Sequence, residues 1–444
     1  MLRIRGESRV RRLETCVVRM CVLACTVMAV FCPTLAEAKP AHGSRNPASS
    51  SGTPAATAIA TMTATATAIP TSTATATPTP AKTATPTPSI TPTARPSASA
   101  TPASLSINGV YDLPNYNTTI PSSITGNSAV DGIAIRTYWN EIEASEGVYN
   151  WSIIDKMIAQ VTPPTINPGK KISISIYAGW GTPSWVFSAG AQSFSWVWDS
   201  GWGPAACSVV KTPLPWDPVF QSKWAAFLAA FGSKYDSNPY VTHVSFTGIN
   251  STDAEVWVPH KINESINVNG VTCKGYNDVA DWQAAGYTRT RMEGALDWDA
   301  AQFASAFPDR PFTIETDPCS LPAIDDNGNF FSSPGNCGDQ QGVTDFLNYG
   351  IDTYGRGHFI IQNDGLSSSP YTELSTFWNT MTADSTYVDI GFQFSYAVGT
   401  TNFDSITQNG VNMGSKVIEF YQSDLTNSGN AAEIVSAHNQ LISK

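Results

Sequence analysis

The chain has 444 residues, with 36 Asp or Glu against 25 Lys or Arg, so that its formal net charge is −11 at pH 7. This acidic balance argues against nucleic acid as a partner, because proteins bind the phosphate backbone through Lys- and Arg-rich surfaces. The 13 Trp, 15 Tyr and 19 Phe side chains suit stacking on sugar rings, but taken alone they favour the filling of a packed core.

Residues 1–38 have the pattern of a cleaved export signal. An arginine-rich start precedes an apolar run over 21–35, and Ala36-Glu37-Ala38 has the small-x-small pattern of a signal-peptidase site. The run is shorter than the roughly 20 apolar residues of a membrane span. Two other readings stay open, twin-arginine export through Arg11-Arg12 and lipid attachment at Cys25. We expect a protein that is secreted or held at the cell surface.

Residues 39–104 are predicted to form a disordered linker. From 48 to 104 the chain is almost wholly Ala, Thr, Pro and Ser, with repeats such as Thr75-Ala76-Thr77-Pro78-Thr79-Pro80. Such a composition cannot bury enough apolar area to fold and stays extended. We expect this linker to hold the following domain away from the cell envelope or from another module.

From residue 105 to 444, short β-branched or aromatic runs alternate with helical stretches. This alternation is typical of βαβ units and a parallel sheet, and the segment has the size of one (β/α)8 TIM barrel. Asp217-Pro218 opens one helix with a capping residue and a proline, and Asn238-Pro239 ends it. The predicted helices are 151–160, 219–235, 287–306 and 342–349. The predicted strands are 106–110, 132–138, 171–178, 241–248, 312–315, 358–362, 388–394 and 416–421.

Four of the eight cysteines lie in the export signal, which leaves an even set in the exported part: Cys207, Cys273, Cys319 and Cys337. An even number in an oxidising compartment predicts two disulfides. Of the three possible pairings, we favour Cys319 with Cys337, which closes a short loop, and Cys207 with Cys273. The chain has no CxxC pair and no ligand spacing among its histidines, so we expect no metal site. We expect no organic cofactor either.

One stretch of the second strand resembles a known family. The sequence Ile135-Arg136-Thr137-Tyr138-Trp139-Asn140-Glu141 and the following Glu146-Gly147-Val148-Tyr149-Asn150-Trp151 resemble the second-strand signature of clan A glycoside hydrolases, particularly the family 42 β-galactosidase-like barrels. Trp180-Gly181-Thr182-Pro183-Ser184-Trp185 and Pro213-Leu214-Pro215-Trp216-Asp217-Pro218 look like the same group. The resemblance covers the first half of the barrel. It implies a glycosidase that cleaves a β-linked poly- or oligosaccharide with retention of configuration.

The resemblance places an acid/base on the fourth strand, usually as Asn-Glu, and a nucleophilic Glu at the end of the seventh. Here Asn250 is not adjacent to a glutamate, so Glu255 is the candidate acid/base and Asp253 the fallback. Gln393 occupies the expected nucleophile position. A neutral amide cannot serve as a covalent nucleophile, so another strand must supply the second carboxylate, or the barrel binds sugar without cleaving it.

Two strand glutamates are the candidates for that carboxylate: Glu419 on the eighth strand and Glu315 at the end of the fifth. A carboxylate flanked by apolar residues needs a partner, and a salt bridge to Arg136 is the alternative to catalysis. Tryptophans after strand ends, including Trp185, suit stacking on sugar rings, although Trp139 also fits a packed rim. The residues that we expect to bind substrate are Arg136, Trp139, Trp180, Trp257, Gln393 and Asp364.

The main functional hypothesis is therefore a secreted glycoside hydrolase. Its first rival is a non-catalytic barrel that binds carbohydrate at the cell surface, and Gln393 is the residue that favours this rival. A transglycosylase on the same fold is the second rival, because this fold hosts many chemistries.

Overall fold

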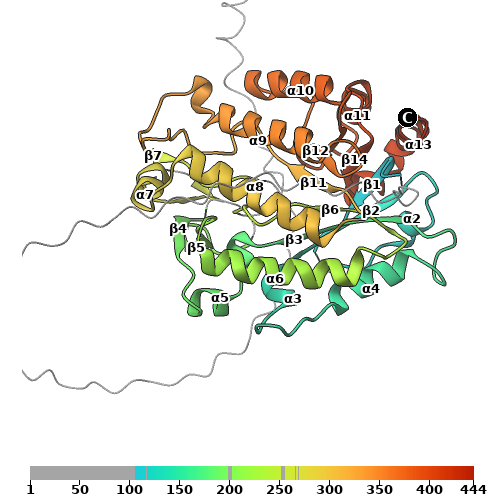
Figure 1. The fold of residues 1–444 in the computed structure, drawn as a ribbon. Coiled ribbons are helices and arrows are strands. Elements are labelled where there is room, and N and C mark those ends of the chain that lie inside the picture. Colours follow the sequence, from blue (N-terminus) through green and yellow to red (C-terminus); the bar gives the residue numbers. More distant parts are fainter. Residues whose placement is uncertain (1–105, 117, 199–202, 252–255, 266, 269) are drawn as a thin grey trace, which may run out of the picture. The chain divides into compact units, whose positions relative to one another are not determined.

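The structure, a computed structural model, describes residues 106–116, 118–198, 203–251, 256–265, 267–268 and 270–444. Eight parallel strands close into a barrel in the order β1-β2-β3-β6-β11-β12-β13-β14, with the helices around it (Figure 1). The predicted (β/α)8 class is thereby confirmed. The barrel strands are β1 (Gly109–Leu113), β2 (Gly132–Tyr138), β3 (Lys171–Tyr177), β6 (Val241–Ser245), β11 (Phe312–Glu315), β12 (Phe359–Leu366), β13 (Asp389–Phe394) and β14 (Val417–Tyr421).

All eight predicted strands have a counterpart in the barrel, and the largest difference is in the first. It was predicted at 106–110 but runs over Gly109–Leu113. The reason is its pairing, because each of its residues from Gly109 to Leu113 pairs in parallel with β14. The carboxyl end of the strand therefore includes Asp112, which a search for apolar runs does not favour.

The outer helices lie close to their predicted positions. In α6, Asp217 caps the amino terminus by accepting hydrogen bonds from the backbone N–H groups of Val219 and Phe220, as its sequence predicts. Longer helices follow most strands, and short ones mark loops at the barrel ends. The helices are α2 (Ser122–Thr125), α3 (Trp139–Ile142), α4 (Ser152–Val161), α5 (Ser184–Ser188), α6 (Pro218–Tyr235), α7 (Asp278–Ala284), α8 (Arg289–Ala306), α9 (Gln340–Thr353), α10 (Thr372–Asp384), α11 (Phe403–Asn412), α12 (Gln422–Leu425) and α13 (Ala431–Ile442).

Strand alternation decides which side chains enter the barrel. Phe394 of β13 and Phe420 of β14 pack against Phe403 of α11, with ring centroids 5.4 Å from it, so these two face the helix layer. Because successive strand residues point to opposite faces, their neighbours Gln393 and Glu419 point into the barrel.

An apolar floor closes the barrel interior toward the amino ends of the strands. A small buried cluster consists of Ile107, Tyr111, Ile360 and Val417. The Tyr111 hydroxyl lies 3.0 Å from the hydroxyl of Thr242. Ile360 and Val417 each precede a polar inward residue by two positions, so this cluster forms the layer immediately beneath the polar part of the interior.

Two insertions extend the carboxyl end of the barrel beside β3 and β6. One carries the hairpin of β4 (Ser193–Val197) and β5 (Val209–Pro213), and the other carries β7 (Ile262–Glu264), β8 (Asn267–Val268), β9 (Val271–Thr272) and β10 (Tyr276–Asn277). The disulfide Cys207–Cys273 links the two insertions, and Cys319–Cys337 closes the loop before α9. Both favoured disulfide pairings are confirmed. Among the described residues, no helix combines the length and apolarity needed to cross a membrane.

Candidate active site

Three carboxyl side chains from three strands meet inside the barrel near the carboxyl ends of its strands. Glu315 of β11 hydrogen-bonds to Asp364 of β12 and to Ser245 of β6. The Gln362 amide donates to Asp364 Oδ1 at 3.3 Å and also hydrogen-bonds to Glu419 of β14. Glu315 and Glu419 are only 3% and 5% exposed. The structure thus brings together three acidic residues that the sequence singled out, and we call them the carboxyl cluster.

Arg136 of β2 faces this cluster from the other side of the barrel. Its guanidinium donates to the backbone carbonyl of Pro114 at 3.1 Å and lies 4.9 Å from the centre of the Tyr116 ring. The positive charge of Arg136 favours the ionised form of Glu419 and lowers the pKa of that carboxyl, whereas burial and the charge of Asp364 raise it. Arg136 is therefore positioned to stabilise negative charge on Glu419.

Burial is the main electrostatic influence on the cluster. It raises the pKa of Glu315 well above the usual carboxyl range, and the negative charges of Asp364 and Glu419 raise it further. Burial is also the largest cause of the raised pKa of Glu419, and the negative charge of Asp364 is the second. Carboxyl groups of this kind keep a proton near neutral pH, which is what a general acid requires.

Gln393 lies beside Glu419 in the sheet. The two residues are register partners on β13 and β14, and Gln393 is largely buried. The position at which the family resemblance predicts a nucleophile therefore carries an amide, while a carboxyl group stands on the adjacent strand. Gly391 leaves room for this arrangement, since a Cβ atom there would lie 2.7 Å from Val417 Cγ1 and 3.0 Å from Gln362 Oε1.

The predicted acid/base Glu255 and its fallback Asp253 lie outside the described residues. The next residue, Val256, donates its backbone N–H to the Glu315 carbonyl at 2.7 Å and forms a parallel bridge with Thr316. The chain after Glu255 therefore rejoins the barrel beside the end of β11, where Glu315 stands.

Tyr116, Tyr138, Trp180 and Trp198, which we call the aromatic wall, form a chain of ring contacts that begins beside Arg136. Tyr116 and Tyr138 are stacked with ring centroids 5.0 Å apart, and Trp180 lies 4.8 Å from Tyr138 and 5.3 Å from Trp198. Trp180 is partly exposed. Trp257 lies in the loop region after β6 and is half-buried, with its ring 5.6 Å from that of His260. Trp180 and Trp257 thus remain candidates for contact with a sugar ring.

The expectation that Trp139 binds substrate is wrong. Trp139 is completely buried, and its ring lies 5.0 Å from Trp224 of α6 and 5.9 Å from Trp185. Its indole N–H donates to Glu143 Oε2 at 2.7 Å. The helix α3 begins at Trp139, so the chain turns there and directs the side chain into the helix layer, where it serves packing.

Sequence reasoning missed the neutral residues that connect the cluster. Ser175 Oγ donates to Ser245 Oγ at 2.6 Å, and Ser245 in turn contacts Glu315. Gln362 joins Asp364 and Glu419. The available signal was polar residues at every second position of otherwise apolar strands, which marks an inward polar face.

No family model matches the chain, and neither does any curated protein. Among solved structures, the barrel resembles the catalytic domain of the β-amylase from Paenibacillus polymyxa, with 12% sequence identity, a TM-score of 0.50, and coverage of 74% of this chain and 98% of that domain. The protein has the fold of this catalytic domain.

Two β-galactosidases are also similar. The enzyme from the psychrophilic Marinomonas ef1 has 11% identity and a TM-score of 0.44, with 74% of this chain and 59% of that chain covered. The enzyme from Bacillus circulans sp. alkalophilus has 10% identity and a TM-score of 0.42, with coverage of 71% and 50%. Such low identities concern the fold alone. The barrel implied by the clan A resemblance is confirmed, and the narrower resemblance to family 42 stays a prediction.

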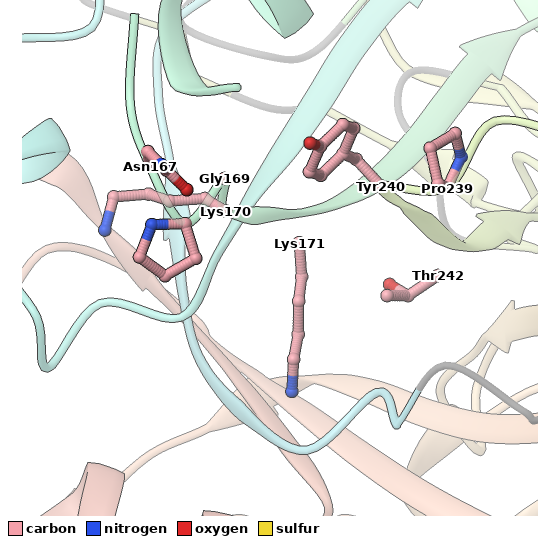
Figure 2. A pocket seen from close by; sticks show the side chains of 8 residues that line it. Asn167, Gly169, Lys170, Lys171, Pro239, Tyr240 and Thr242 are labelled. Carbon is pink, nitrogen blue, oxygen red and sulfur yellow. The ribbon is translucent and has the colours of Figure 1, made fainter. Parts of the chain in front are cut away.

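A separate cavity of about 270 Å³ lies near the amino ends of β3 and β6 (Figure 2). Figure 2 shows the side chains of Lys170 and Lys171 extending in different directions. Lys170 Nζ donates to the carbonyls of Asn127 and Val130 at 2.9 and 2.6 Å, and Lys171 Nζ donates to the carbonyl of Asn108. Both ammonium groups thus hydrogen-bond to backbone carbonyls near the amino ends of the barrel strands, away from the carboxyl cluster.

Proposed function

We propose that this protein is a glycoside hydrolase that cleaves β-linked poly- or oligosaccharides with two carboxyl groups of the barrel. The observation that carries the proposal is the carboxyl cluster of Glu315, Asp364 and Glu419, in which both glutamates are buried, near the strand ends where barrels of this fold place their active sites. The aromatic wall beside it supports a sugar as the ligand.

Glycoside hydrolysis needs a carboxylic acid that protonates the leaving oxygen and a carboxylate that attacks or activates water. Glu419 fits the carboxylate by its position beside Gln393 and because the charge of Arg136 opposes the rise of its pKa, which burial brings to about 8. Glu315 fits the acid, because burial and its negative neighbours favour its protonated form. Glu255 is the other candidate acid. Retention of configuration is what the family resemblance implies.

The proposal is tested by incubating the purified chain with a panel of β-linked polysaccharides and oligosaccharides and measuring new reducing ends. We expect release of products from at least one substrate, and proton NMR of the earliest product should show the β anomer. An early α anomer would replace retention by inversion. No release from any substrate, with Glu419→Gln indistinguishable from the parent, would reject the enzyme.

Gln393 favours a second candidate, a barrel that binds carbohydrate without cleaving it. Saturable binding to a polysaccharide that stays intact after long incubation would support this function. Longer products formed only when an acceptor sugar is added would instead indicate transglycosylation.

We also propose that the barrel acts outside the cell, on the linker that follows the export signal. The two disulfides support an oxidising compartment. A mature protein whose mass corresponds to a chain beginning at Lys39 is the expected result of mass spectrometry after expression with export, and an uncleaved chain would contradict it.

Trp180→Ala is expected to weaken oligosaccharide binding about fivefold to tenfold, because an aromatic face contributes on the order of 1 kcal/mol beyond area burial. Binding is measured by calorimetry with Trp298→Ala as the matched control, since Trp298 lies on α8 in the outer layer. Equal affinities for the two variants would remove Trp180 from the binding site.

A further inference from the structure

The starting observation is an exposed tyrosine whose hydroxyl group is held by a carboxylate. Tyr371 stands between β12 and α10, and it is 45% exposed. Its hydroxyl donates to both carboxylate oxygens of Asp317, each at a distance of 2.7 Å. An exposed side chain without such a partner changes rotamer readily. Asp317 therefore fixes the direction of an aromatic ring that remains accessible to solvent.

Asp317 is itself fixed in a tight turn that directly follows β11. Its carboxylate accepts from the backbone N–H of Cys319 at 2.8 Å, and its own backbone N–H donates to Ser320 Oγ at 3.0 Å. The disulfide from Cys319 to Cys337 joins this turn to the loop before α9. Asp317 lies only two residues after Glu315 of the carboxyl cluster. The tyrosine ring is thus attached to the strand end that carries a candidate acid.

Trp257 belongs to a segment that runs along the same turn. The backbone N–H of Val256 donates to the Glu315 carbonyl at 2.7 Å, and that of Val258 donates to the Ser320 carbonyl at 3.1 Å. Both valines are buried, whereas Trp257 between them is partly exposed. The change in burial places the tryptophan on the accessible side of this segment. The turn after β11 therefore has a second accessible aromatic side chain beside it.

This turn lies across the carboxyl end of the barrel from the aromatic wall. In the ring of eight strands, β2 and β12 have three strands between them in either direction and so stand opposite each other. Tyr138 of the wall belongs to β2, and Tyr371 follows β12. The carboxyl cluster lies inside the same end of the barrel, with Glu315 at the last position of β11. A sugar chain that extends from the wall over the cluster therefore reaches the turn after β11.

We propose that Tyr371 and Trp257 form a second sugar-binding subsite, in which Asp317 positions the tyrosine ring. The ligand is a chain of several sugar units, because only such a chain reaches both the aromatic wall and this subsite. An aromatic face suits the apolar face of a sugar ring. Binding of sugar at Tyr371 does not depend on catalysis. The further statement, that the cleaved bond is internal to the chain, rests on the proposed function.

The subsite is tested by calorimetry on the full chain with oligosaccharide series from β-1,4-glucan, β-1,3-glucan, β-1,4-mannan and β-1,4-galactan. All variants carry Glu419→Gln, which keeps the sugar chains intact. We expect one series to bind more tightly as its chains lengthen. Tyr371→Ala should then weaken binding of the longest chain about fivefold to tenfold, the effect of losing one aromatic face, and leave binding of the shortest bound chain unchanged. The control is Tyr387→Ala, at a tyrosine that is 65% exposed and precedes β13 at the amino end of the barrel.

Substitutions at Asp317 distinguish positioning of the ring from a purely structural link between two loops. Tyr371→Phe removes the hydroxyl and Asp317→Ala removes the carboxylate, so each should weaken binding of the longest chain about twofold to fivefold. Asp317→Asn keeps an oxygen that accepts from the tyrosine and should bind as the parent does. A structural link alone would lower the midpoint of thermal unfolding in Asp317→Ala and leave the chain-length dependence of affinity unchanged, which would overturn the positioning role.

Equal affinities of Tyr371→Ala and Tyr387→Ala for the longest chain, or no binding of any series, would overturn the subsite. With Glu419 intact, the first products from the longest chain should be of intermediate length, and Tyr371→Ala should raise KM for that chain more than it lowers kcat. Release of single sugar units alone would overturn internal cleavage. Weakened binding in Tyr371→Ala without hydrolysis of any substrate would support the subsite and reject the proposed function.

Discussion

Glu419→Gln is expected to lower kcat for hydrolysis by on the order of 10³- to 10⁵-fold, the largest effect among single substitutions in this protein. Gln has nearly the shape of Glu but no charge, so it can neither attack the anomeric carbon nor activate water. Its hydrogen bond with Gln362 can persist, which keeps the site assembled. The measurement is release of reducing ends under saturating substrate.

The matched control is Glu146→Gln, at an exposed glutamate that pairs with Lys223. This variant should keep the parent rate. Parallel measurements on Glu255→Gln and Glu315→Gln assign the acid, because loss of the acid is expected to spare substrates with a leaving group that needs no protonation. If Glu419→Gln hydrolyses at a rate close to that of the control, Glu419 is not the catalytic carboxylate.

The second large effect concerns the pH dependence of stability. Burial raises the pKa values of Glu315 and Glu419 in the folded chain above the ordinary value of 4.5. Their protonated forms therefore favour the folded state. This contribution is fully present below pH 4.5 and is lost as the pH rises through the folded pKa values. Relative to the wild type, Glu419→Gln should gain on the order of 2–4 kcal/mol in unfolding free energy between pH 4.5 and pH 8.

Urea unfolding at several pH values measures this difference. Other buried groups titrate too, among them His243, whose pKa is lowered to about 3 by burial. Subtracting the wild-type curve from the variant curve cancels their contributions. Glu146→Gln should give a curve parallel to that of the wild type. If the Glu419→Gln curve is also parallel, Glu419 titrates as an ordinary carboxyl group.

The strands and helices were largely predictable because each depends on local patterns, such as the Asp217-Pro218 start of α6. The candidate glutamates were also visible, since a carboxyl group in an apolar strand is conspicuous. The side of the sheet to which each glutamate points was not predictable, because Glu419 has apolar neighbours in the sequence whichever way it points. Phe420 packs against Phe403 of the helix layer, so the adjacent Glu419 must point into the barrel.

The contacts within the site depend on the relative positions of strands far apart in sequence. Gln362 joins Asp364 and Glu419 only because β12 pairs with β13 and β13 pairs with β14. Trp139 shows the opposite case, in which one local turn reverses an expectation. It directly follows a strand end, as a sugar-stacking residue would, but α3 begins there and directs the ring inward.

The bond between Cys207 and Cys273 has a practical consequence for producing the protein. It spans a sequence separation of 66 residues and joins two insertions, while the barrel strands themselves contain no cysteine among the described residues. Material made in a reducing cytosol would keep the hydrogen-bonded strands of the barrel but lose the covalent link between the insertions. The insertions would then be held together by contacts such as the stacking of Phe194 on Trp282. Expression hosts that export the chain through an oxidising compartment should therefore give the more homogeneous preparation.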